Sequence, residues 1–205
     1  CMSLSKKIRI SLAVGLAAAI IFSICSFAKT SGEIRSDVLR LHVIANSDSS
    51  VDQNLKLRVR DFILQEGKSI FDGSVTVGNA VEKIEPQLRE LEKSANEFVR
   101  QAGFNYKVKV TLSKEYFTTR TYENVTLPAG KYLALRVVIG SGEGHNWWCV
   151  MFPPMCVPAA NKNNEIDKVF SDDEIRLVQS RPKYEPRFKI IEIYESVREK
   201  LSEND

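Results

Sequence analysis

The sequence predicts an α+β domain: an antiparallel sheet of about four or five strands with helices packed on one face, preceded by an N-terminal signal or anchor segment. Three observations lead to this fold class. A long uncharged run lies near the N-terminus, and the first half of the chain then repeats apolar residues at helical spacing. Several segments of the second half alternate apolar and polar residues, as strands do. Helices followed by a run of strands are typical of α+β domains.

The N-terminal segment has the parts of an export signal in the correct order. Three basic residues lie within the first nine positions, residues 10–27 carry no charge, and small residues flank Phe27. Basic residues stay on the cytoplasmic side of a membrane, which places the remainder of the chain outside. The uncharged run is long for a cleaved signal and close to the length that spans a bilayer. Residues 1–28 are therefore predicted to be a signal peptide cut after Ala28 or a retained membrane anchor.

The leader also explains the charge of the chain. It holds three of the 29 basic residues and none of the 26 acidic ones, so residues 29–205 carry 26 of each. The pI of about 8.6 is thus an effect of the leader and gives no support to nucleic-acid binding. Residues 29–205 are long enough to bury a sizeable core, and we expect a single extracytoplasmic α+β domain there.

The elements follow one another in a clear order. The prediction is a strand at 38–46, a helix from Ser50 to about Gly67, a helix at 76–101, strands at 106–112, 116–122, 131–139 and 146–152, a short helix from Ser171 to Val178 and a final helix near 188–201. Ser50 and Gln53 stand at capping-box spacing, which indicates a helix start. Pro86 should kink or split the second long helix. Residues 187–193 could alternatively form a strand.

The segment Asn146-Trp-Trp-Cys-Val-Met-Phe-Pro-Pro-Met-Cys156 is the richest in functional residue types. Large aromatic residues anchor binding interfaces. The hypothetical partner-binding set is Asn146, Trp147, Trp148, Phe152, Pro153 and Pro154. Consecutive strand residues point to opposite faces, so one indole ring should enter the core and the other should be exposed or covered within the domain.

Cys149 and Cys156 are predicted to form a disulfide, because an exported chain meets an oxidising environment and the Pro-Pro pair can reverse the chain between them. Three alternatives stay open: two buried thiols, a metal site shared with His145, and a catalytic thiol. The spacing matches no closed zinc pattern, and no base is evident that would activate a thiol. We therefore expect no metal and no cofactor.

Four polar residues are secondary functional candidates: His42, Asn46, Asp48 and His145. Folding could gather them, with Glu143, into an acid–base site. A histidine on the polar face of a strand is more often simply exposed or hydrogen-bonded, and the sequence holds no nucleophile elbow and no HExxH motif. We expect no catalytic residues and no enzyme activity. The alternatives are an exported hydrolase that uses His42, Asp48 and His145, or a passive envelope component.

Four stretches of the chain closely resemble the stage II sporulation protein R family. They are residues 38–48, 52–61, 127–140 and 146–156, with a weaker match at 187–192. The Asn-Trp-Trp-Cys block is long and unusual, which makes the resemblance specific. Met155 stands where the family more often has leucine, and residues 117–118 and 122–123 differ from the expected Phe-Pro and Tyr-Gly. These departures are typical of changes in turns and packing.

The resemblance implies a signalling role. Such proteins are made in the forespore and exported into the space between two membranes. There they activate a membrane-embedded aspartic protease of the mother cell, which removes the pro-sequence of sporulation sigma factor E. The chain would then be a ligand that biases the protease toward an active state. Its partners would be this protease and, with an uncleaved leader, the membrane, but no nucleic acid.

Overall fold

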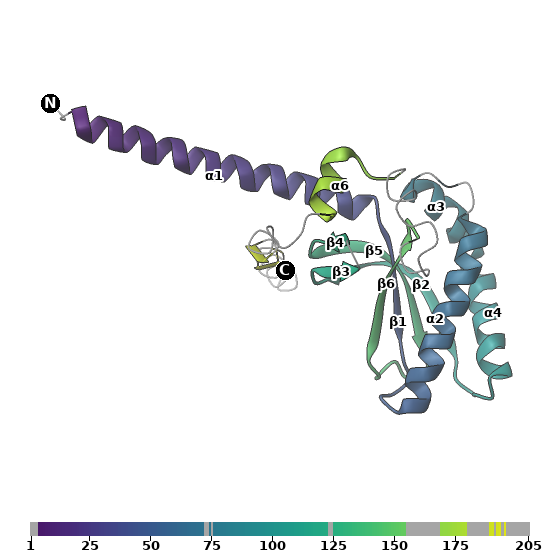
Figure 1. The fold of residues 1–205 in the computed structure, drawn as a ribbon. Helices are drawn as coiled ribbons and strands as arrows, with labels where there is room; N and C mark the ends of the chain where they lie inside the picture. The colour runs from purple at the N-terminus through teal and green to yellow at the C-terminus, as the bar shows by residue number, and fades with distance from the viewer. Residues whose placement is uncertain are drawn as a thin grey trace, which may run out of the picture.

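The computed structural model describes residues 4–71, 74, 76–122, 125–154, 169–179, 189–190, 192–193 and 195. The elements in order are α1 (Leu4–Ser36), β1 (Leu39–Ile44), α2 (Ser50–Ile70), α3 (Val77–Ile84), η1 (Glu85–Gln87), α4 (Leu88–Gln101), β2 (Val108–Phe117), β3 (Arg120–Tyr122), β4 (Val125–Leu127), β5 (Gly130–Ile139), β6 (Asn146–Phe152) and α6 (Asp172–Val178). Helix α1 projects far from the domain, and α2, α3 and α4 lie together on one side of the sheet (Figure 1).

The main sheet has four strands in the order β2-β5-β1-β6, and β3 and β4 form a separate hairpin. The predicted α+β class and the helix-covered sheet are confirmed. One pair departs from a purely antiparallel arrangement, since β1 runs parallel to β5. Strands β6 and β2 are antiparallel to their neighbours. Parallel neighbours need a long crossover, and here the chain between β1 and β5 includes three α-helices and β2.

Helix α2 shows how local chemistry sets an element's limits. The hydroxyl of Ser49 accepts a hydrogen bond from the backbone N–H of Asp52, so the helix is capped one residue before the predicted start at Ser50. The helix also continues through Gly67, the predicted end, to Ile70. A side chain at Gly67 would collide with Met151 on β6, so this glycine permits close packing of the helix on the sheet.

Other predicted elements are confirmed, with one exception. The helix predicted at 76–101 is split at Pro86, as expected, into α3 and α4 with a short 3-10 turn between them. Ser171 caps α6 through a capping box. The strand predicted at 116–122 is wrong: β2 pairs with β5 as far as Phe117, and residues 120–122 then turn away into the hairpin.

The final helix is described only in part. Residues 189–190, 192–193 and 195 are helical, which contradicts a strand at those described positions of 187–193. The remainder of the helix predicted near 188–201 lies outside the described residues.

Two cores lie on opposite faces of the sheet. The first joins Leu41 and Val137 of the sheet to α2, α3 and α4. The second joins Val150 of β6 to α6, the hairpin and the end of α1, which contributes Phe27 and Ile34. Strand β1 is therefore buried along its whole length, including its polar residues.

Candidate functional site

A chain of polar contacts crosses all four strands on the second face of the sheet. The His42 ring has Nδ1 2.5 Å from Oε2 of Glu115 and Nε2 2.9 Å from Oδ1 of Asn146. The other carboxylate oxygen of Glu115 lies 3.3 Å from Nε of Arg136 and accepts a hydrogen bond from the Ser113 hydroxyl at 3.1 Å. The register explains this meeting, since His42 stands opposite Arg136 on β5 and opposite Trp148 on β6.

These contacts keep Glu115 charged. Burial raises the pKa of its carboxyl group, but the hydrogen bonds and charges of His42, Ser113 and Arg136 outweigh burial and lower the pKa below its ordinary value. The carboxylate thus holds His42 on one side and Arg136 on the other.

The two tryptophans point to opposite faces, as strand alternation predicts. Trp148 stacks on His42 with ring centroids 3.8 Å apart, and Phe117 meets it edge to face at 4.8 Å. Trp147 packs against the first core, and the guanidinium of Arg60 lies 4.4 Å from its ring centroid. Both indole rings are half-buried, so each is partly covered within the domain.

The other members of the hypothetical partner-binding set divide by burial. Asn146 is exposed and Pro154 is half-buried, whereas Phe152 and Pro153 are buried. Phe152 meets the ring of Phe71 edge to face at 6.1 Å in the first core. Phe152 and Pro153 therefore lie inside the fold, and the role of the set in partner binding stays a prediction.

Cys149 is buried and disulfide-bonded. Cys156 lies outside the described residues, so its pairing with Cys149 stays a prediction. Cys25 is a free, exposed cysteine in α1. Within the described part of the chain, no three histidine, cysteine or acidic side chains are grouped so that they could hold a metal ion.

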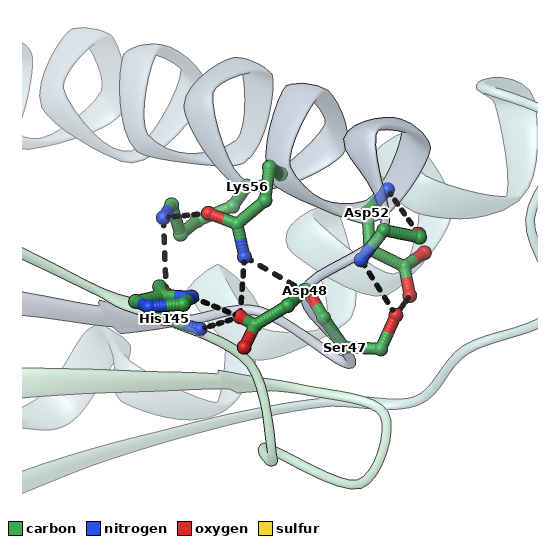
Figure 2. A network of polar contacts seen from close by, with 7 residues as sticks. Ser47, Asp48, Asp52, Lys56 and His145 are labelled. Carbon is green, nitrogen blue, oxygen red and sulfur yellow. Dashed lines mark hydrogen bonds and ion pairs between the residues drawn. The ribbon is translucent and has the colours of Figure 1, made fainter.

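A second polar cluster joins the loop after β1 to the loop before β6 (Figure 2). The carboxylate of Asp48 accepts a hydrogen bond from the backbone N–H of His145 at 2.6 Å and contacts the His145 ring. The ammonium group of Lys56 donates to the His145 carbonyl at 3.0 Å and to Gln53 at 2.5 Å. The hydrogen bond from the His145 N–H is the main cause that lowers the pKa of Asp48.

Asp52 is the buried end of this cluster. Its carboxylate accepts hydrogen bonds from the Ser47 hydroxyl at 2.6 Å and from the Asn46 amide at 2.9 Å. These bonds lower the pKa of Asp52, and its place in the first turn of α2 also suits a negative charge. Asn46 in turn accepts from the backbone N–H of Ser141 at 3.0 Å. The cluster thus holds two loops and a helix end together.

The structure brings together only part of the predicted acid–base set. Asp48 contacts His145, whereas His42 belongs to the separate contact chain with Glu115 and Asn146. No serine, threonine or cysteine side chain among the described residues is hydrogen-bonded to either histidine ring. An Asp–His pair supplies two of the three members of a nucleophilic triad, and the described part of the chain places no nucleophile beside this pair.

Arg40 was missed by the sequence analysis. Its side chain is fully buried, and its guanidinium lies 4.1 Å from the ring centroid of Phe117 and 4.9 Å from that of Tyr132. It donates one hydrogen bond, to the Tyr122 hydroxyl on the hairpin. Among the residues that the structure describes, its Nε and Nη1 atoms have no hydrogen-bond partner. Aromatic faces therefore provide most of the surroundings of this buried cation.

Helix α1 is the one helix in the described part of the chain that is long and apolar enough to cross a membrane. The residues before Phe27 are mostly exposed, whereas Phe27, Ser31 and Ile34 are buried against the domain. The predicted cleavage position after Ala28 thus lies inside a continuous helix, close to where it enters the second core.

The fold and the site together define a class of protein. It has an α+β domain with two ordered polar networks, preceded by one apolar N-terminal helix of the signal or anchor type. The family model for stage II sporulation protein R matches residues 35–162, and the chain belongs to this family. Stage II sporulation protein R of Bacillus subtilis (strain 168) is 37% identical over 123 residues, which are 60% of this chain and 55% of that protein. The chain therefore matches about half the length of this relative. No solved structure matches the chain.

The family gives the chain a role in sporulation, and it is a family of sporulation proteins rather than an enzyme family. The matched range contains both polar networks and both tryptophans.

Proposed function

We propose that the chain is an exported sporulation signalling protein. It activates a membrane-embedded aspartic protease and thereby triggers processing of the precursor of sporulation sigma factor E in the mother cell. The observation that carries this proposal is the family match over residues 35–162. The apolar helix α1 supports it, because such a helix can direct the domain across the forespore membrane.

The physical task of such a protein is to shift an equilibrium. A ligand changes the balance between inactive and active protease only by binding the active state more tightly. A shift from about 1% to about 99% active requires a preference on the order of 10⁴-fold. An ordered surface serves this task, because side chains that are already fixed lose little entropy on binding.

We propose further that the leader is retained as an anchor. Helix α1 has 33 residues, which at about 1.5 Å per residue span about 50 Å, more than the roughly 30 Å of a bilayer core. Its last turns lie within the domain, where Phe27 and Ile34 are buried. Retention therefore keeps the second core complete and confines the signal to the membrane of the cell that sends it.

Co-expression tests the function. The full chain is produced with the candidate protease and the sigma factor E precursor in a bacterium that does not sporulate, and the shortened sigma factor is detected by immunoblot. We expect processing only when the chain is present and its leader directs export. Equal processing without the chain would support a passive envelope component instead.

A hydrolase is the second candidate, favoured by the Asp48–His145 pair. His145 is exposed, so His145→Ala should leave the core unchanged. A hydrolase that uses this imidazole as its base would lose activity by about 10²-fold or more. Signalling through another surface would continue, and the co-expression assay therefore separates the two functions.

A further inference from the structure

We propose that the chain binds its protease partner through the uncovered half of the second sheet face, centred on Trp148 and Arg136, and that the partner presents an acidic segment there. This inference rests on the proposed function and assigns the surface through which it acts. We call this surface the Trp148–Arg136 surface; it also includes Lys109.

Among the described residues, the helices and the hairpin that cover the second sheet face lie at one end of it. There the end of α1, the hairpin and α6 pack on the sheet and form the second core (Figure 1). Toward the other end, β2 contributes Lys109 and β5 contributes Arg136, and both side chains are exposed. The register places them on the face that carries Trp148, since residues paired across neighbouring strands share a face.

The charge of this surface that is available to a partner is positive. Glu115 is its acidic residue within the described part of the chain, and His42, Ser113 and Arg136 already engage its carboxylate. The Arg136 side chain is 44% exposed, and its Nε lies 3.3 Å from Oε1 of Glu115. The ammonium of Lys109 has no ion-pair partner among the described residues. A guanidinium fork fits a carboxylate with two hydrogen bonds, which favours an acidic partner.

The surface is also ordered before any partner binds. Glu115 and Asn146 hold the His42 ring, and that ring supports one side of the Trp148 indole. Glu115 fixes the inner end of Arg136. Tryptophan and arginine are the residue types most enriched among binding hot spots, and ordered side chains reduce the entropy lost on association. Trp147 takes no part, because it lies on the opposite face beneath Arg60.

Charge reversal in the co-expression assay tests the surface. We expect Arg136→Glu and Lys109→Glu each to reduce processing by at least about tenfold, which corresponds to about 1.4 kcal/mol of binding. Lys114→Glu makes the same change of charge on β2, but Lys114 points to the opposite face, and we expect processing within about twofold of wild type. Immunoblots of exported protein control for folding and export, and Arg136→Gln is a second variant that adds no repulsion with Glu115.

Site-specific photocrosslinking gives an independent readout. A photoreactive amino acid at position 109 should crosslink the full chain to the protease, and the same amino acid at position 114 should not. Normal processing by both Arg136→Glu and Lys109→Glu, or a crosslink from position 114 alone, would overturn the surface and leave the proposed function standing. Absence of processing with the wild-type chain would overturn the function and this inference together.

Discussion

At the scale of single residues, the most unusual feature is the buried charge of Arg40. Arginine stays protonated in proteins, and a buried charge without an acidic partner is costly. Burial lowers the pKa of Arg40, and the phenol groups of Tyr122 and Tyr132 partly oppose this shift. Three aromatic rings and one hydrogen bond to Tyr122 offset the desolvation of the guanidinium.

The conservative substitution of Arg40 by lysine should therefore reduce the stability of the fold more than its substitution by methionine. We expect Arg40→Lys to be less stable than Arg40→Met by about 2 kcal/mol, because lysine brings a more strongly hydrated charge into the same buried site and loses the planar stacking of arginine. Urea unfolding of the full chain, followed by tryptophan fluorescence, measures the difference. A lysine variant as stable as the methionine variant would mean that the site tolerates any cation.

At the scale of elements, the Asp52 cluster joins the start of α2 to the loop after β1 and, through Asn46, to the loop between β5 and β6. The hydrogen bonds from Ser47 and Asn46 lower the pKa of Asp52 in the folded state. Since the unfolded carboxyl has its ordinary pKa of about 3.9, this stabilisation is complete above that pH and is lost as the pH falls through the lower folded pKa.

Asp52→Asn should consequently lower the free energy of unfolding by about 1–2 kcal/mol at pH 7, because two half-buried donors lose a buried, charged acceptor. The difference in the free energy of unfolding between the variant and the wild type should become smaller at pH 3. Urea unfolding at both pH values measures it. Asp61→Asn is the matched control: Asp61 is on the same helix but is exposed, so its effect should be small at either pH. A loss that does not change with pH would contradict a role for the charge.

The elements also show which parts of the structure can be predicted from the sequence. The break at Pro86, the cap at Ser171 and strand β6 follow from local chemistry, and the sequence predicts each correctly. The hairpin strands have three residues each, too few for a clear alternation. His42 was singled out from its strand, but Glu115 lies 73 positions away, and only the pairing of β2 with β5 beside β1 brings the two together. Register of this kind is a tertiary property, which explains why Glu115 and Arg136 were missed.

At the scale of the whole molecule, the leader and the domain are one continuous structure. Helix α1 begins as an exposed apolar rod and ends inside the second core, with no linker between the two parts. With the leader retained as the proposed anchor, a domain attached in this way would have a restricted orientation relative to the membrane. Arg35 of α1 lies against Gly130 at the start of β5, whereas Arg136 lies further along that strand, away from the helix.

This continuity leads to a prediction that separates retention from cleavage. Phe27 is 6% exposed and Phe22 is 78% exposed, although both lie on α1. With the leader retained, Phe27→Ala should destabilise the exported domain by about 3 kcal/mol, the usual loss for a buried phenylalanine, and Phe22→Ala should have little effect. Cleavage after Ala28 would remove both side chains, so neither substitution could alter the stability of the product. Urea unfolding of the exported protein, recovered from both the membrane and the soluble fraction, measures its stability, and its intact mass shows whether the leader is present. A product that begins at Lys29 would contradict the anchor and favour a diffusible signal.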